Sequence, residues 1–153
     1  TKVVPRLLLT ISRLSSRQSG AMFPIEPEAS LSELSENGHL LDAELNSYLL
    51  ESIFFPKSPL HDGGVVVRDD RIVAASCLFP LSQNTDVDKR LGTRHRAALG
   101  LSEETDAFVL VVSEETGAVS TASGGKLDHG LSLAQLEAQL NDLYGNKKSK
   151  ASS

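Results

Sequence analysis

The sequence has little of what disulfide-bonded, membrane-spanning or base-stacking proteins need. A single cysteine, Cys77, excludes an internal disulfide and fits a reducing compartment. There is no tryptophan and aromatic residues make up 5% of the chain, so platforms for stacking nucleic-acid bases are scarce. No apolar run approaches the length of about 20 residues that a helix needs to cross a bilayer. These absences leave a compact globular domain as the expectation.

Positive charge is also scarce overall, but it is concentrated in one segment. The 153 residues carry a formal net charge of -5, which argues against general binding of nucleic acids. Residues 89–102 nevertheless contain four cations and no acid, around the stretch "LGTRHRAALG". A local cation cluster on an acidic protein indicates a small anionic ligand, most simply a phosphate group.

Helical and strand patterns alternate along the first half of the chain. Apolar residues at helical spacing predict an amphipathic helix over residues 3–16, with Pro5 in its first turn. The segment "AMFPIEP" can form a strand, but Pro24 cannot donate a ladder bond, so this strand is expected at an edge or broken. Asp42 is the expected N-cap of a second helix, which Pro56 stops.

The second half predicts more strands and two further helices. Two strands joined at residues 69–70 follow the second helix. A short helix capped by Thr93 is expected to end near Gly100. Two strands then flank a turn at residues 115–117, and a last helix is capped by Ser132, with Leu133, Leu136 and Leu140 spaced for packing.

These elements predict an α/β fold, in which a single globular domain holds a mixed β-sheet flanked by helices. The expected divisions are an N-terminal helix over residues 1–18, the main domain over residues 19–144 and a disordered basic tail over residues 145–153.

Three polar clusters fall at the ends of predicted elements, and the first is "HDGG", residues 61–64. A carboxylate beside two glycines leaves the backbone open to close approach by a ligand. Asp62 could bind a divalent cation or polarise a hydroxyl, and His61 could add a nitrogen ligand. The alternative is an ordinary turn before a strand.

The second cluster is Thr93 to Arg96, at the start of the predicted short helix. Cations are unfavourable at a helix N-terminus, because they face the positive end of its dipole, by about 0.3–1 kcal/mol each. Their placement is understandable if an anion binds there. The alternative is a solvated basic turn whose cations pair with Asp86, Asp88 or Glu103.

The third cluster is "SEETG", residues 113–117, at the end of an apolar strand. Ser113 could donate to a phosphate, and Glu114 or Glu115 could bind a cation; the alternative is a hairpin turn with exposed acids. His39 and His129 lie in polar loops and are expected at the surface. Together the three clusters indicate metal-assisted phosphoryl chemistry.

The segments "SPLHDGGVVV", "LGTRHRAALG" and "VVSEETGAVS" resemble the three signature segments of diadenylate cyclase domains. The resemblance runs from about Ser19 to Leu140 and is strongest to the membrane-anchored class. It implies condensation of two ATP into cyclic di-AMP with release of two pyrophosphates. A 3′-hydroxyl of one ATP would attack the α-phosphate of the ATP held by the facing subunit of a homodimer.

The resemblance also implies roles for individual residues. Asp62 and Gly63 would be catalytic, and Leu78 would border the adenine. His61 and Glu115 would bind Mg²⁺ or Mn²⁺. The residues implied to bind phosphate are Thr93, Arg94, His95, Arg96 and Ser113.

Two features depart from the family pattern. Gly64 stands where the family usually has Ala, and Pro24 and Pro27 stand in a strand that the family fills with aliphatic residues. The first departure loosens the backbone by about 0.5–1 kcal/mol. The second puts the sheet edge in question more than the chemistry.

The resemblance further implies a cytoplasmic domain of a membrane-anchored bacterial protein, with contact to the membrane only through a segment missing from this chain and no nucleic-acid polymer as partner. Two alternatives remain. One is a non-catalytic nucleotide-binding regulatory domain, and the other is a scaffold that recognises an anionic protein tail with Arg94 and Arg96.

Overall fold

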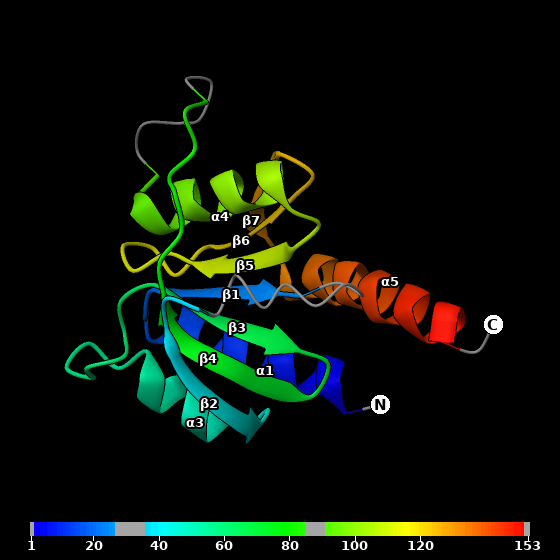
Figure 1. Cartoon of the computed structure of the whole chain (residues 1–153), viewed down its shortest axis with the longest axis horizontal. Helices are drawn as coiled ribbons and strands as arrows, with labels where there is room; N and C mark the ends of the chain where they lie inside the picture. Colours follow the sequence, from blue (N-terminus) through cyan, green and yellow to red (C-terminus); the bar gives the residue numbers. More distant parts are fainter. Residues whose placement is uncertain (1, 27–35, 85–90, 152–153) are drawn as a thin grey trace.

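A seven-stranded sheet with helices on both faces forms the computed structural model, which describes residues 2–26, 36–84 and 91–151, the last six as backbone only (Figure 1). The helices are α1 (Val3–Ser16), α3 (Ser47–Ile53), α4 (Thr93–Glu104) and α5 (Leu133–Ala151). The strands are β1 (Ala21–Ile25), β2 (His39–Glu44), β3 (Gly64–Arg68), β4 (Arg71–Cys77), β5 (Phe108–Val112), β6 (Val119–Ser123) and β7 (Lys126–Leu131). The predicted α/β domain with a mixed sheet is confirmed.

The strand order is β2-β4-β3-β1-β5-β6-β7, and it explains where the polar clusters meet. β1 pairs parallel to β3, whereas the other described neighbours pair antiparallel. Because β1 runs parallel to β3 and antiparallel to β5, the start of β3 and the end of β5 lie at the same edge of the sheet, on either side of the start of β1. The "HDGG" and "SEETG" segments therefore flank that edge.

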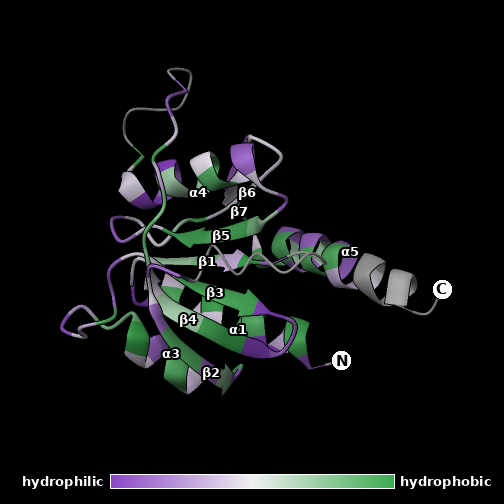
Figure 2. Cartoon of the chain, in the orientation of Figure 1, coloured by the Kyte–Doolittle hydropathy of each residue, from purple (hydrophilic) through white to green (hydrophobic). Residues whose placement is uncertain are grey.

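Alternation along the strands divides the core between the two faces of the sheet. On the face covered by α1, α3 and α5 lie the odd-numbered residues of β1 and β3, such as Phe23, and the even-numbered residues of β5, such as Leu110. Met22, Val66 and Val109 face the other way, toward α4. Figure 2 shows β3 and β5 as hydrophobic along most of their length, as expected for strands that are covered on both faces.

Helix α1 forms as predicted and is part of the main core. Its residues Leu7 and Ile11 are fully buried against the sheet and the neighbouring helices. At its C-terminal end, Arg13 Nε and Arg17 Nη1 lie 2.9 and 3.3 Å from the same Glu51 carboxylate oxygen of α3. Apolar burial and this ion-paired contact together fix α1 against α3.

The expectation that β1 is an edge or broken strand is wrong, because β1 lies between β3 and β5. Its ladder with β5 runs without interruption from Ala21 to Ile25. Glu26 N donates to Val67 O at 2.9 Å, so by the alternation of backbone groups the nitrogen of Pro24 also faces β3. The missing N–H therefore weakens only the β3 side.

The predicted helix start at Asp42 is also wrong. Asp42 lies in strand β2 with a positive φ of 47°, at an irregularity in the pairing with β4. The helix begins at Ser47, where Asn46 accepts hydrogen bonds from the backbone N–H groups of Tyr48 and Leu49. Asn46 takes the capping role because its side-chain oxygen, Oδ1, can reach both N–H groups from an extended backbone.

Helix α4 differs from the prediction at both ends. Its N-cap is Gly92, not Thr93, and no side chain caps it. It continues past Gly100 to Glu104. Gly100 is required for close packing: a Cβ there would lie 2.5 Å from the carbonyl oxygen of Pro80. Ala97, Ala98 and Leu101 point inward as predicted.

The C-terminal third contains two corrections. The segment after the Gly124-Gly125 turn forms strand β7, so His129 lies on a strand and not in a loop. The last helix has the predicted Ser132 cap, but Leu133 is 46% exposed, and α5 continues to Ala151 through the segment predicted to be disordered. Across the described part of the chain, no helix combines the length and apolarity that a membrane span requires.

Candidate functional site

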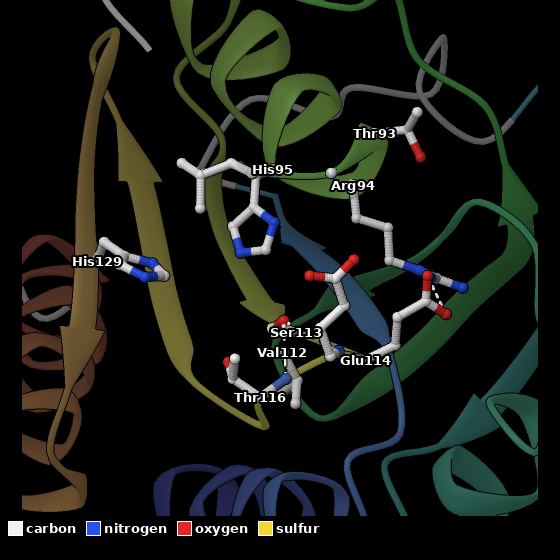
Figure 3. A pocket seen from close by; sticks show the side chains of 11 residues that line it. Thr93, Arg94, His95, Val112, Ser113, Glu114, Thr116 and His129 are labelled. Atoms are coloured by element: carbon white, nitrogen blue, oxygen red, sulfur yellow. Dashed lines mark hydrogen bonds and ion pairs between the residues drawn. The ribbon is translucent and has the colours of Figure 1, made fainter. Parts of the chain in front are cut away.

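Two adjoining cavities lie at the sheet edge where the polar clusters meet. The first, of about 340 Å³, is lined by residues 91–95 and 112–116 together with His129 (Figure 3). The second, of about 330 Å³, is lined by residues 61–63, the segment after β4 and part of α4. Thr93, Arg94 and Glu114 line both cavities. The start of α4 thus forms a shared wall.

Arg94 stands at the boundary between the cavities. Its Nη1 lies 3.6 Å from Glu114 Oε2, and its Nη2 donates to the carbonyl oxygen of His61 at 3.3 Å. Its Nε is buried with no hydrogen-bond partner among the described residues. Gly20 permits this placement, because a Cβ there would lie 2.7 Å from Arg94 Nη1. The guanidinium therefore has donor capacity left for an anion on either side.

His95 points from α4 into the protein beside the first cavity. It is 4% exposed, and its Nε2 is buried without a hydrogen-bond partner in the described part of the chain. Burial, His129 and Arg94 together lower the pKa of His95 to about 4, so the ring is neutral near pH 7. An unpaired buried polar nitrogen costs about 1–3 kcal/mol, which a bound ligand can offset.

The turn after β5 presents a hydroxyl to the first cavity. Ser113 Oγ accepts hydrogen bonds from the backbone N–H groups of Glu115 at 3.2 Å and Thr116 at 3.3 Å. A hydroxyl that accepts twice still has its proton to donate. Ser113 therefore both shapes the turn and can donate to an anionic oxygen.

The loop before β3 pairs an imidazole with a carboxylate. His61 Nδ1 lies 2.7 Å from the carbonyl oxygen of Ser58, which can only accept, so Nδ1 carries a proton. In the neutral ring, Nε2 then has the lone pair, and it lies 3.3 Å from Asp62 Oδ1. Two acceptors at this distance suit a shared proton or cation.

Gly63 and the segment after β4 shape the second cavity. Gly63 has a φ of +80°, and a Cβ there would lie 2.5 Å from the carbonyl oxygen of Cys77. Asn37 holds the backbone of Leu78 in two hydrogen bonds, of 2.7 and 2.9 Å. Phe79 is the one aromatic side chain among the described residues that line this cavity. The second cavity thus combines an apolar wall, formed largely by the segment after β4, with the polar side chains of the loop before β3 and of α4, and Asp62 lies at its rim.

Cys77 also lines the second cavity, and we expect its thiol to be a weak nucleophile. The residue is fully buried, and burial raises its pKa to about 11. Because the thiolate is the nucleophilic form, Cys77 acts as a small apolar wall residue.

Most of the predicted site residues are brought together, but not all. Asp62, Gly63 and Leu78 line the second cavity, and His95 and Ser113 line the first. Arg96 is not among the described residues that line either cavity, because a step of two residues along a helix turns through about 200°, so Arg96 leaves α4 on the side away from Arg94.

The predicted metal pair is separated. His61 lines the second cavity and pairs with Asp62, whereas Glu115 lines the first. No cluster of three or more His, Cys, Asp or Glu side chains in the described segments is placed to hold a metal ion. Any metal here would need ligands from a bound substrate.

Three contributors to these cavities could not be predicted from the sequence. Phe79 carried no motif signal, and Gly20 looked like a helix terminator. His129 is exposed, as expected, but it lies on β7 and lines the first cavity, which no local pattern indicated. Each depends on contacts between segments far apart in the chain.

The fold and the two cavities define an α/β domain suited to a ligand with an anionic part near the start of α4 and a second part beside Leu78 and Phe79. Residues 9–127 match the family described as DisA bacterial checkpoint controller nucleotide-binding. The chain therefore belongs to this diadenylate cyclase (DAC) domain family, as its three signature segments predicted.

Named relatives agree with this membership. The chain is 52% identical over 117 residues to the diadenylate cyclase CdaS of Bacillus thuringiensis, a match that covers 76% of this chain and 58% of that protein. It is 42% identical over 139 residues to the cyclic di-AMP synthase CdaA of Bacillus subtilis, covering 91% and 51%. The chain thus spans little more than half the length of these two relatives.

Solved structures confirm the fold. DacA from Staphylococcus aureus, solved as a double mutant, superposes with a TM-score of 0.90 at 37% sequence identity, covering 94% of this chain and 95% of that chain. A Bacillus cereus protein described as a hypothetical membrane spanning protein gives a TM-score of 0.81 at 47% identity, covering 86% of this chain and 65% of that chain.

Proposed function

We propose that this chain is a diadenylate cyclase domain, which condenses two ATP into cyclic di-AMP and releases two pyrophosphates. The observation that carries the proposal is the pair of cavities joined at Arg94, with Asp62 at the rim of the second one. Similarity to proteins named diadenylate cyclase supports it.

The two cavities suggest how ATP binds. The adenine would enter the second cavity, beside Leu78 and Phe79, where an aromatic ring can stack on the base. The triphosphate would extend into the first cavity, toward the N-terminus of α4 and the Ser113 hydroxyl. Arg94 would exchange Glu114 for phosphate oxygens, a stronger charge-assisted pair.

The proposed reaction assigns Asp62 the part of general base. Its carboxylate accepts the proton of a ribose 3′-hydroxyl, and the oxygen forms a bond to the α-phosphorus of the facing ATP. The bond from that phosphorus to the β-phosphate oxygen breaks, and pyrophosphate leaves with the electron pair. Two such steps close the ring. Since the described part of the chain offers this one pair of adjoining cavities at the site, a second copy would supply the other ATP.

The residues present fit a metal ion only in part. His61 Nε2 and Asp62 Oδ1, 3.3 Å apart, would provide two ligands, and phosphate oxygens of ATP and water the remainder. A bound divalent cation supplies charge neutralisation at the phosphates and lowers the pKa of an attached hydroxyl. An imidazole ligand favours Mn²⁺ over Mg²⁺, which prefers oxygen ligands.

A membrane-anchored parent protein is a related proposal. It is supported by the similarity to the Bacillus cereus protein described as membrane spanning, and by the fact that the chain covers about half of its longer relatives.

One product assay tests the proposed function. The chain is incubated with ATP and Mn²⁺ or Mg²⁺, and cyclic di-AMP is measured by mass spectrometry. Asp62→Asn should reduce the rate by at least about 10²-fold with ATP binding nearly unchanged, because the general base is lost while the contacts to the adenine and the triphosphate remain. Asp106→Asn, at an exposed aspartate outside both cavities, is the matched control and should keep full activity.

Two results would contradict the proposal. ATP binding without product under either metal, at concentrations that favour dimers, would favour a non-catalytic nucleotide-binding domain. Equal loss of ATP binding and activity in Asp62→Asn would assign Asp62 a structural role.

A further inference from the structure

The first cavity receives a side chain from outside the three signature segments. Its other described lining residues belong to residues 91–95 and 112–116, and His129 comes from β7. Figure 3 shows the His129 ring projecting from β7 toward His95, on the far side of the cavity from Arg94. Strand β7 therefore closes a wall that the signature segments leave open.

The His129 ring is held in position by two contacts. Its Nδ1 lies 2.7 Å from Oγ of Ser120, which is fully buried on the neighbouring strand β6. Its ring packs edge-on against His95, with centroids 5.9 Å apart and an interplanar angle of 71°. A side chain fixed from two sides loses little further freedom when it binds a ligand.

These contacts leave one nitrogen of His129 for a ligand. Because Nδ1 is engaged by Ser120, Nε2 is the available nitrogen. When the Ser120 hydroxyl donates to Nδ1, Nε2 carries the proton and can donate to an anionic oxygen. A second proton would make Ser120 the acceptor and add a positive charge to the ring.

The surroundings of this nitrogen select an anion. The same cavity contains the N-terminus of α4 and Arg94; its two carboxylates among the described residues, those of Glu114 and Glu115, are exposed, and that of Glu114 is paired with Arg94. His95 adds a buried Nε2 with no hydrogen-bond partner in the described segments, an independent sign of a ligand-binding position. His129 lines the first cavity but not the second, so it stands on the side away from Asp62 and Leu78.

We propose that His129 is a binding residue for the terminal phosphates of the nucleotide, the part that leaves as pyrophosphate. The identity of the nucleotide as ATP rests on the proposed function; the preference for a polyphosphate rests on the cavity. His129 would hold the leaving group and would not touch the ribose or the base.

Calorimetric titration with ATP, pyrophosphate and AMP tests this assignment. His129→Ala should weaken ATP and pyrophosphate binding on the order of tenfold, the value of one charge-assisted hydrogen bond, and leave AMP binding unchanged. His129→Gln, which can place an amide N–H near the position of Nε2, should recover much of this loss. His39→Ala is the matched control, since His39 is an exposed histidine on the opposite edge strand β2.

The proposal is overturned if ATP and pyrophosphate bind to His129→Ala as to the wild type. It is equally overturned if AMP affinity falls in parallel, because His129 would then only support the fold. Should His129→Ala unfold, as shown by its melting temperature, the comparison of His129→Gln with wild type decides. Binding requires no turnover. If the wild-type chain binds polyphosphate through His129 but forms no product, the cyclase proposal fails and the assignment of His129 stands.

Discussion

Pro24 and Gly64, two positions at which other residues were expected, lie close together on the neighbouring strands β1 and β3. A Cβ at Gly64 would lie 3.2 Å from Cδ of Pro24 and 3.3 Å from Cε2 of Phe79. The proline ring is covalently closed, so it cannot rotate away from an added methyl group. A glycine at position 64 therefore leaves room for the ring of Pro24 in the centre of the sheet, so the residue at one position permits the residue at the other.

A double-mutant cycle tests this relation. Gly64→Ala in the wild-type chain should lower the free energy of unfolding by about 1 kcal/mol, because the added methyl group crowds the ring. With Pro24→Val also present, the same change should be neutral or stabilising, since alanine restricts the unfolded chain. Urea unfolding of all four proteins gives the coupling energy. Additivity within about 0.5 kcal/mol would show that the two positions are independent.

Sequence reasoning located single residues where a local signal existed. Asp62 and Ser113 follow from glycine-rich and turn patterns next to apolar strands. Arg96 was grouped with Arg94 but is not among the described lining residues of either cavity, because the motif gives the residues and not the direction in which each leaves the helix. His129 had no local signal, since its place depends on the pairing of β7 with β6.

At the scale of elements, α4 shows how one residue can be misread. A glycine near the end of an apolar helical pattern is a common helix terminator, yet Gly100 lies inside α4. It permits α4 to approach residues 80–82, where a Cβ would lie 2.5 Å from the carbonyl oxygen of Pro80 and 3.0 Å from Ser82 N. This segment continues from Leu78 and Phe79, so α4 packing sets the position of the second cavity's wall.

Two glycine-to-alanine changes separate propensity from packing. Gly145→Ala, in α5 with open space around the position, should stabilise the chain by up to about 1 kcal/mol. Gly100→Ala should destabilise it by about 1–3 kcal/mol and weaken AMP binding, because the 80–82 segment must move. Thermal unfolding and titration measure both effects. Stabilisation by Gly100→Ala with AMP binding intact would show that this close contact is not structurally required.

Most elements could be predicted because their patterns are local. The β3–β4 turn and the β5–β6 turn both form where expected. Strands β2 and β7 were missed because they are edge strands with mostly exposed residues, without a continuous apolar pattern. The central place of β1 was missed because a proline rule was applied without knowing which neighbour its nitrogen faces.

For the whole molecule, the proposed reaction requires two copies with one Asp62 each. Each Asp62 would activate one 3′-hydroxyl, and the ring contains two new phosphodiester bonds. Activity per chain should therefore rise with protein concentration until dimers predominate. The need for a second copy cannot be read from a single chain, because in the proposed reaction one chain would be only half of the reacting assembly.

Mixing wild-type chain with Asp62→Asn tests this division of labour. A mixed dimer should form one bond, release one pyrophosphate and stop at a linear dinucleotide that keeps a 5′-triphosphate. Chromatography with mass detection should show this product at its maximum near equal amounts of the two chains. If the mixtures yield only cyclic product, in proportion to the wild-type dimer, and no linear dinucleotide, then each Asp62 does not activate the formation of one phosphodiester bond.

The burial of Cys77 has a practical consequence for such experiments. The sequence contains no other cysteine, and this thiol is shielded from solvent with a raised pKa. Alkylating dyes, which react with thiolates, should leave the native chain unlabelled. A cysteine introduced at an exposed position would then carry a single fluorophore or spin label, so energy transfer between two labelled copies could follow their encounter in solution without first removing a native residue.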